Sequence, residues 1–415
     1  MEMENVRGGS GPAKRLTAAK PKASASRSDS AIAAARDTTQ ETLHWTMLSS
    51  QTRGSMGRWS HWKRRRSTNQ EVSLMRPMLA LLVIGASSMC LPGFADAQNV
   101  GDVFRRVNPS VVVIRAKGSD VEGAGGLTRF TETGSGVLIS ADGKVMTAAH
   151  VVHSMDDIKV EILGGETVSA RVISSEPAAD LSLLQLERVP AGARVATMAD
   201  SDTVRVGDLV VIVGAPYGLS HSMSAGWISA RWPANSVYRS MPLAEFLQTN
   251  ATINTGNSGG PMFNINGDVI GIVSHNISKS GGSEGLGFVV TINTAKKLLL
   301  ERPSFWSGLE GHLISGPIAQ ILNVPQPTGY LVKSVARGSA GDAVGLRGGA
   351  ALATIMGEQL VVGGDIILKV QGVAVGDVTD HRRVRDILDA VAPGGEFTMT
   401  VLRLGRVIEL KGRHP

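Results

Sequence analysis

The chain has 415 residues, of which 42% are apolar and 4% aromatic, and it contains 49 glycines. That length and composition suit a globular, turn-rich protein of two or three domains and exclude a chain that is disordered throughout. The formal charge of +6 comes from residues 1–77, which hold 14 Lys and Arg against 6 Asp and Glu; the remaining 28 basic and 30 acidic residues balance to −2. We therefore expect no nucleic-acid binding by the folded part, although the basic run at 61–66 could contact phosphate or anionic lipid.

An uncharged apolar stretch runs from Met78 to Ala95, and small residues then flank Asp96 as they do at a secretory cleavage site. We predict a signal peptide over residues 75–97 with cleavage after Ala97. Residues 1–74 would then be a disordered basic segment upstream of the true start. A membrane anchor and an organelle transit segment are the alternatives, and the glycines and proline of the stretch favour cleavage over an anchor.

Cys90 is the single cysteine and lies within this apolar stretch. Cleavage would leave a mature protein without a thiol, a disulfide or a cysteine-based metal site. A lipid anchor on Cys90 is disfavoured because the preceding Met89 is bulky.

Many short apolar runs follow, separated by turn residues. Such runs predict an antiparallel barrel or sandwich. Asp142-Gly143 and Asn266-Gly267 lie between runs and favour two-residue hairpin turns, because both pairs accept positive φ. The runs occupy residues 110–116, 136–140, 144–152, 158–163, 181–187, 209–216, 225–231, 268–275 and 287–292.

A short helix ending before Pro303 closes this first domain, which we place at 98–303. A second module is expected over 304–415, with strands at 328–335, 365–372 and 396–405. Between the last two strands, residues 380–391 predict a helix. Its apolar side chains follow helical spacing and form one core-facing side, made of Val384, Ile387, Leu388 and Val391.

Ser258 lies in "GNSGGPMF", residues 256–263, where residues with almost no side chain surround it. A tight turn would use the same residue types. A serine nucleophile would need them too, because backbone N–H groups must point at a developing oxyanion.

A nucleophilic serine also requires a base and a carboxylate that orients the base. His150 ends the probable strand "VMTAAH", and Asp180 stands at the head of the apolar run "DLSLLQL". A carboxylate there is costly unless it is paired. Taken singly, each residue is more readily explained as a turn, cap or core residue. Together they follow the order His, Asp, Ser of chymotrypsin-type enzymes.

The segments "TAAHVV", "DLSLLQL" and "TGNSGGP" resemble the triad segments of the HtrA/Deg family of trypsin-like serine proteases. The similarity extends from about residue 101 to the C-terminus and includes "GSGVLIS", "GAPYGL" and "GLGFVVTIN". It implies a mainly β fold, with a chymotrypsin-like protease domain of two six-stranded β-barrels at 98–303. An α+β PDZ domain at 304–415 is implied by "TGYLVKSVARGSAGDAVGL".

The resemblance assigns a role to each triad position. Ser258 is the implied nucleophile, His150 the general base and then acid, and Asp180 the residue that fixes the imidazole tautomer. The N–H groups of Gly256 and Ser258 are implied to form the oxyanion hole.

The implied substrate-binding residues surround the serine in sequence. Ile253 would line the S1 pocket, and an apolar wall without an acidic residue at Thr252 predicts small or medium aliphatic P1 side chains. The backbone of Ser274, His275 and Asn276 would pair with the substrate strand.

In the PDZ-like module, the loop of Ser307, Gly308 and Leu309 would accept a peptide carboxylate, with the helix at 380–391 as the other groove wall. A segment between Gly349 and Gly363 is additional to the usual family pattern. Its effect on the groove does not follow from the sequence.

The resemblance predicts an exported, ATP-independent endopeptidase of the bacterial periplasm or envelope, or alternatively of an organelle lumen. Its partners would be unfolded or misfolded proteins and, at the PDZ domain, peptide C-termini. No cofactor or metal is expected, and a homotrimer or higher multiple would form through the segment around 103–107. Because Asn250 and His275 depart from the family pattern, a PDZ-carrying holdase or stress sensor with a resting protease domain is the alternative.

Overall fold

The computed structural model describes residues 99–122, 126–238, 240–392 and 394–414, which belong to one compact unit. The expected basic segment at 1–74 and the signal peptide at 75–97 lie outside the described residues. Within the described part, no helix is long and apolar enough to cross a membrane.

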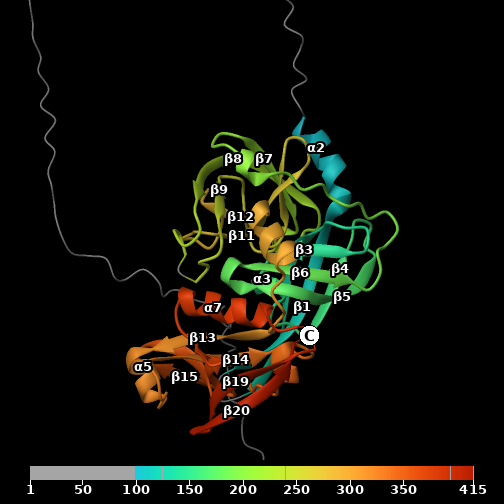
Figure 1. Ribbon diagram of the computed structural model, residues 1–415. Coiled ribbons are helices and arrows are strands. Elements are labelled where there is room, and N and C mark those ends of the chain that lie inside the picture. The colour runs from blue at the N-terminus through green and yellow to red at the C-terminus, as the bar shows by residue number, and fades with distance from the viewer. Residues whose placement is uncertain (1–98, 123–125, 239, 393, 415) are drawn as a thin grey trace, which may run out of the picture. The chain divides into compact units, whose positions relative to one another are not determined.

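The N-terminal part of the described chain forms two closed antiparallel barrels (Figure 1). The first closes in the order β1-β2-β3-β6-β5-β4. Its strands are β1 (Val111–Glu122), β2 (Gly126–Leu138), β3 (Lys144–Thr147), β4 (Asp157–Glu161), β5 (Thr167–Glu176) and β6 (Leu181–Leu186).

The second barrel closes in the order β10-β11-β12-β9-β8-β7. Its strands are β7 (Leu209–Gly214), β8 (Ser222–Trp232), β9 (Phe246–Thr249), β10 (Pro261–Asn264), β11 (Val269–Asn276) and β12 (Gly287–Thr291). Two six-stranded barrels in succession confirm the predicted chymotrypsin-like double barrel.

Alternation along the strands divides the apolar side chains between separate cores. In β6, Leu184 and Leu186 fill the first barrel, whereas Leu181 and Leu183 face a core that both barrels share. The shared core includes Phe263 from the second barrel, and a buried side chain of this size contributes about 1.5–3 kcal/mol. The loops at the barrel interface, which carry the candidate site, are therefore held by packed strands on both sides.

Helices are short in the barrel part of the chain, and α2 packs against the core that the barrels share (Figure 1). Its buried Val103 and Val107 contact the protein's own interior, so a trimer through this segment would have to use its exposed face. The helical segments are α2 (Val100–Val107), η1 (Asn108–Ser110), α3 (Ala149–Val152), η2 (Pro177–Ala179), η3 (Ser201–Thr203), η4 (Pro216–Gly218), α4 (Ile292–Lys296) and the π-helical η5 (Lys297–Glu301).

The two predicted hairpin turns form, but not as two-residue loops. Residues 139–143 join β2 to β3, and residues 265–268 join β10 to β11. Only the glycines, Gly143 and Gly267, have positive φ, at 93° and 83°. A two-residue type I′ turn needs positive φ at both central residues, so the longer loops replace it.

The C-terminal module is a sheet in the order β13-β14-β17-β19-β20, with β18 paired to β17. The predicted helix is α7 (Val378–Asp389), two residues earlier than expected because Asp377 caps the N–H groups of Thr379 and Asp380. The other elements are β13 (Leu309–Ser315), α5 (Gly316–Ile321), β14 (Thr328–Val335), α6 (Ala340–Ala343), β17 (Ile366–Val370), β18 (Val373–Ala374), β19 (Glu396–Arg403) and β20 (Arg406–Arg413).

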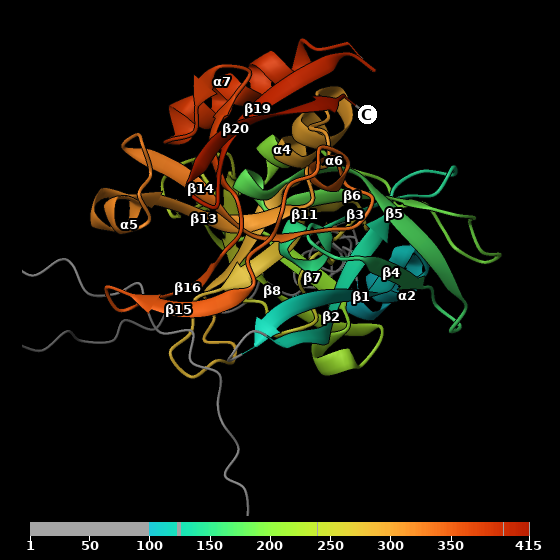
Figure 2. The same ribbon diagram turned by 90° about the horizontal axis from the view of Figure 1, so that it is seen from below.

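The additional segment between Gly349 and Gly363 forms a hairpin of β15 (Ala351–Ile355) and β16 (Glu358–Val362). Figure 2 shows it as a ribbon apart from the sheet of β13 and β14. Leu360 is buried in a core with Leu331 and Ile366 of that sheet. The insertion therefore adds to the hydrophobic core on one side of the module and does not line the cavity beside α7.

Candidate active site

The three triad candidates come from different elements at the junction of the barrels. His150 lies in α3, directly after β3, and Asp180 follows η2 at the head of β6. Ser258 lies in the loop that leads into β10 of the second barrel. Asp180 has φ of 53°, a left-handed conformation that Asp tolerates better than most residues and that turns the chain sharply into β6.

The side chains of His150 and Asp180 form a tight pair. His150 Nδ1 lies 2.9 Å from Asp180 Oδ1 and 3.0 Å from Oδ2, and the backbone N–H of His150 also donates to Oδ1 at 3.1 Å. Because the carboxylate accepts the Nδ1 proton, Nε2 remains as the basic nitrogen. The paired Asp180 is 6% exposed, which shows how the sequence can place a carboxylate at the start of a buried strand.

The electrostatics of this pair suit a general base. Burial alone lowers the pKa of His150, but the charge of Asp180 and its hydrogen bond outweigh burial and hold that pKa above the ordinary 6.5. Burial likewise favours a higher pKa for Asp180, and the opposing contacts of His150 and Ser274 bring that pKa below its usual value. The carboxylate therefore stays ionised and stabilises an imidazolium.

The hydroxyl of Ser258 donates to the backbone carbonyl of Ser274 at 3.1 Å. Among the described residues it forms no hydrogen bond with His150. A nucleophilic Ser258 would have to exchange this carbonyl for His150.

Glycines beside Ser258 are required by their backbone geometry. Gly256 has φ of 100°, and a Cβ there would lie 2.1 Å from the carbonyl oxygen of Ala215. Gly259 has φ of 81°, and a Cβ there would lie 2.1 Å from Thr147 Oγ1. In the described part of the chain, no hydrogen bond occupies the N–H of Gly256 or Ser258. Both groups are thus available to an oxyanion.

Ser135, in β2, anchors this loop and was not predicted from the sequence. Its Oγ donates to the carbonyl of Gly256 at 2.7 Å and accepts the N–H of Ala215 at 3.0 Å. The sequence feature that could have indicated this role of Ser135 is the pair of glycines, Gly134 and Gly136, that flank it within a strand, where Ser135 is fully buried.

The expected substrate-binding residues lie together at the end of β11. A β-bulge interrupts its pairing with β12 between Val273 and His275. Asn276 Nδ2 donates to the carbonyl of Ile253 at 3.2 Å. Ile253 itself is 2% exposed within the core of the second barrel, and its place in an S1 pocket stays a prediction. Substrate pairing along Ser274–Asn276 stays a prediction.

Ser274 has a second role that the sequence did not indicate. Its side-chain hydroxyl donates to Asp180 Oδ2, on the side of the carboxylate away from the backbone of His150. The bulge re-aims this side chain toward the triad, and only the folded strand pairing reveals the bulge.

The predicted carboxylate-binding loop lies at an apolar cavity of about 790 Å³. Ser307 and Leu309 line it, and Gly308 between them has φ of 66°. Val384 and Leu388 of α7 line another side of the cavity. Residues of the barrel part, including Pro177 and Pro242, also line this cavity, and peptide binding there stays a prediction.

Residues of the first barrel also reach the C-terminal module. His153, three residues after His150, is buried and contacts Ser175 Oγ at 2.7 Å and Ser307 Oγ at 3.2 Å, and burial lowers its pKa to about 4. Glu176, in the segment that leads to Asp180, contacts Arg385 of α7 at 3.0 Å and His381 at 3.3 Å. His153 is therefore a buried structural histidine.

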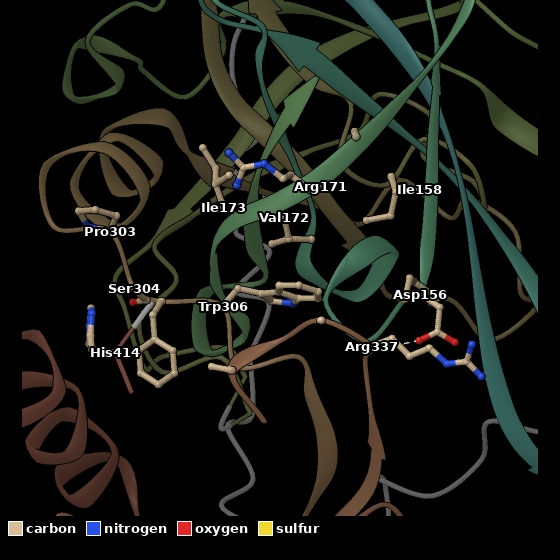
Figure 3. A pocket seen from close by; sticks show the side chains of 15 residues that line it. Asp156, Ile158, Arg171, Val172, Ile173, Pro303, Ser304, Trp306, Arg337 and His414 are labelled. Atoms are coloured by element: carbon tan, nitrogen blue, oxygen red, sulfur yellow. Dashed lines mark hydrogen bonds between the residues drawn. The ribbon is translucent and has the colours of Figure 1, made fainter. Parts of the chain in front are cut away.

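A further cavity, of about 620 Å³, opens around Trp306 on the side of β5 (Figure 3). Its walls include Val172 and Ile173, and Arg337 borders it with its backbone N–H bonded to Asp156 at 3.0 Å. Trp306 Nε1 donates to the carbonyl of His153 at 2.6 Å. This cavity holds none of the triad residues. No group of side chains that could hold a metal ion occurs in the described ranges.

The fold and this arrangement resemble those of a trypsin-like serine peptidase. A protein family described as "Trypsin-like peptidase domain" matches residues 134–272. Similar curated proteins include a "Probable periplasmic serine endoprotease DegP-like" of Ectopseudomonas mendocina, 31% identical over 71% of this chain and 62% of the relative. The "Periplasmic pH-dependent serine endoprotease DegQ" of Escherichia coli is 29% identical over 76% of this chain and 70% of the relative.

The "Periplasmic serine endoprotease DegP" of Escherichia coli is 32% identical over 59% of this chain and 52% of the relative. The chain therefore spans about half to seven tenths of the lengths of these relatives. Among solved structures, "HtrA-type protease AlgW with decapeptide" aligns with a TM-score of 0.44 and 25% identity, over 76% of this chain and 98% of that one. The chain is thus similar to serine endoproteases of the HtrA/Deg family.

Proposed function

We propose that this protein is an exported, ATP-independent serine endopeptidase that cleaves peptide bonds in unfolded or misfolded proteins. The observation that carries the proposal is the pairing of His150 with the buried carboxylate of Asp180, next to a loop in which Ser258 has two free backbone donors beside it. Attack by Ser258 would form a tetrahedral intermediate. The hydroxyl proton of Ser258 would move to His150 Nε2, and the oxyanion of the intermediate would lie at the N–H groups of Gly256 and Ser258.

The names of the relatives support an exported location, because they are called periplasmic proteases. The C-terminal module would bind a peptide terminus in the cavity between Leu309 and α7, by adding a strand to the edge of β13. Domains at 98–303 and 304–415, a homotrimer or higher multiple, and an aliphatic preference at P1 belong to the same proposal.

Cleavage of a disulfide-free unfolded protein by residues 98–415 tests the proposal, beside a Ser258→Ala variant. We expect serine-dependent cleavage that peptides with free apolar C-termini stimulate. Cleavage that survives Ser258→Ala would assign the activity to another residue or to a contaminant.

A holdase or stress sensor is the second candidate, and the resting hydroxyl of Ser258 on the Ser274 carbonyl favours it. In this case both proteins would bind the unfolded chain, and neither would cut it with or without peptide. Measuring binding and cleavage in the same samples separates the two functions.

A further inference from the structure

A second layer of polar groups lies behind the carboxylate of the triad. Ser274 Oγ donates to Asp180 Oδ2, and His275 Nδ1 lies 2.9 Å from the same Ser274 Oγ. Successive side chains on a regular strand point to opposite faces. The bulge in β11 at this point allows Ser274 and His275 to meet.

The number of protons on each group fixes the donor and the acceptor in the hydrogen bonds that link Asp180, Ser274 and His275. Asp180 is ionised and can only accept. The single hydroxyl proton of Ser274 is committed to Asp180, so Ser274 Oγ can only accept from its other neighbour. His275 must therefore donate through Nδ1–H. Its Nε2 then carries a lone pair, and this buried atom has no hydrogen-bond partner within the described residues.

Surrounding aromatic rings fix the imidazole in this position. The ring of His275 stacks on Phe288 with centroids 5.5 Å apart and an interplanar angle of 13°, and it meets Tyr238 edge to face at 4.1 Å. Burial lowers the pKa of His275 to about 4; Asp180 opposes this effect and the charge of His150 adds to it. Among the described residues, Asp180, His150 and Tyr238 are the titratable groups that act on or contact the ring. His275 is neutral wherever the triad can work.

We propose that His275 is a positioning residue of the triad, acting through Ser274 to direct the hydroxyl proton of Ser274 onto Asp180. This inference rests on the proposed function. Without His275, the hydroxyl of Ser274 has no donor to lock its rotation, and Met241 Sδ at 4.0 Å is another acceptor within reach. Loss of this hydrogen bond strengthens the attraction between the carboxylate of Asp180 and a protonated His150. The pKa of His150 therefore rises.

Two substitutions separate the hydrogen bond from the packing. His275→Phe keeps a ring stacked on Phe288 but removes the donor, whereas His275→Asn places an amide N–H near the position of Nδ1. In His275→Phe we expect kcat to fall about two- to tenfold with KM almost unchanged, and His275→Asn to recover most of the loss. We also expect the pKa of His150, followed by NMR of labelled histidine, to rise by about half a unit in His275→Phe.

Ser274→Ala supplies the control, because His275 acts only through Ser274. With Ser274→Ala already present, His275→Phe should change neither kcat nor the pKa of His150 further. An equal loss in both backgrounds, or a failure of His275→Asn to recover activity, would overturn the proposal. If the chain does not cleave protein at all, the proposed function fails, and the His150 titration still decides the role of His275.

Discussion

At the scale of single residues, the account depends on a neutral His150 beside an ionised Asp180. Because the pKa of His150 is held above its ordinary value, kcat/KM should fall with acidification through a midpoint above 6.5. A pH profile of kcat/KM with a small unfolded substrate measures this midpoint. A midpoint at or below 6.5 would contradict the pairing.

Asp180→Asn is the matched control for that profile. It removes the charge that raises the pKa of His150, so the acidic midpoint should move down. It should also lower kcat by about 10⁴, because the amide no longer holds the working tautomer. His150 contributes to folding with the opposite pH sense: its raised pKa stabilises the folded state below the unfolded value of that pKa. This contribution is lost as pH rises through the folded value.

Gly256→Ala tests the oxyanion loop. A Cβ at this position would lie 2.1 Å from the carbonyl oxygen of Ala215, so the peptide must tilt and its N–H must turn away from the oxyanion. We expect kcat to fall by about 10²–10³. Gly207→Ala is the control, since Gly207 also has positive φ, 95°, but a Cβ there meets nothing within 4 Å. A similar loss in both variants would point to general strain.

At the scale of elements, the hairpin β15–β16 tests whether the additional segment is structural. Leu360 is 3% exposed in a core with Leu331 and Ile366, whereas Leu352 on the partner strand is 40% exposed. Leu360→Ala should lower the free energy of unfolding of the C-terminal module by about 2–5 kcal/mol. Leu352→Ala should change it by less than about 0.5 kcal/mol. Denaturant titration of both variants measures the difference, and equal effects would contradict the packing.

The elements also show where sequence reasoning succeeds. Short apolar runs predicted most of the barrel strands, and apolar residues at helical spacing predicted the core-facing side of α7, because burial selects apolar residues at those positions. Turn details failed: Asp142 and Asn266 lack the positive φ that their sequence pattern favours, and the loops are longer. Loop length depends on the register that the paired strands adopt, which a local dipeptide does not encode.

The candidate site likewise combines residues that the sequence predicts with residues that it does not. The sequence pattern pointed to His150, Asp180 and Ser258 because each lies at the edge of a distinctive run. Ser135 and the side chain of Ser274 escaped notice, since their contacts join residues 121 and 94 positions apart. The sequence around a serine in a strand does not indicate whether its side chain forms a hydrogen bond with a distant loop or with a buried carboxylate.

At the scale of the whole molecule, the buried carboxylate of Glu176 links the segment before Asp180 to α7. Burial alone raises the pKa of Glu176, but His381, Arg385 and Ser304 together bring it below its ordinary value. The carboxylate therefore stabilises the fold above its unfolded pKa, and this contribution is lost as pH falls through the lowered value.

Arg385→Ala should leave that carboxylate without its arginine and lower the free energy of unfolding near neutral pH by about 3–5 kcal/mol. Arg383→Ala is the control, because Arg383 lies on the same helix, is 65% exposed and pairs only loosely with Asp380 at 3.8 Å. Calorimetry at neutral and acidic pH compares the two variants. A loss for Arg385→Ala that does not shrink on acidification would contradict the role of Glu176.

The proposed function depends above all on Ser258 being a nucleophile that His150 and Asp180 activate. Covalent labelling with a fluorophosphonate, in the presence of a peptide with a free apolar C-terminus, tests it most directly. We expect one phosphonyl group per chain, located on Ser258 by mass spectrometry and absent from His150→Ala. A chain that cleaves unfolded protein while Ser258 stays unlabelled, or that carries the label on another residue, would contradict it.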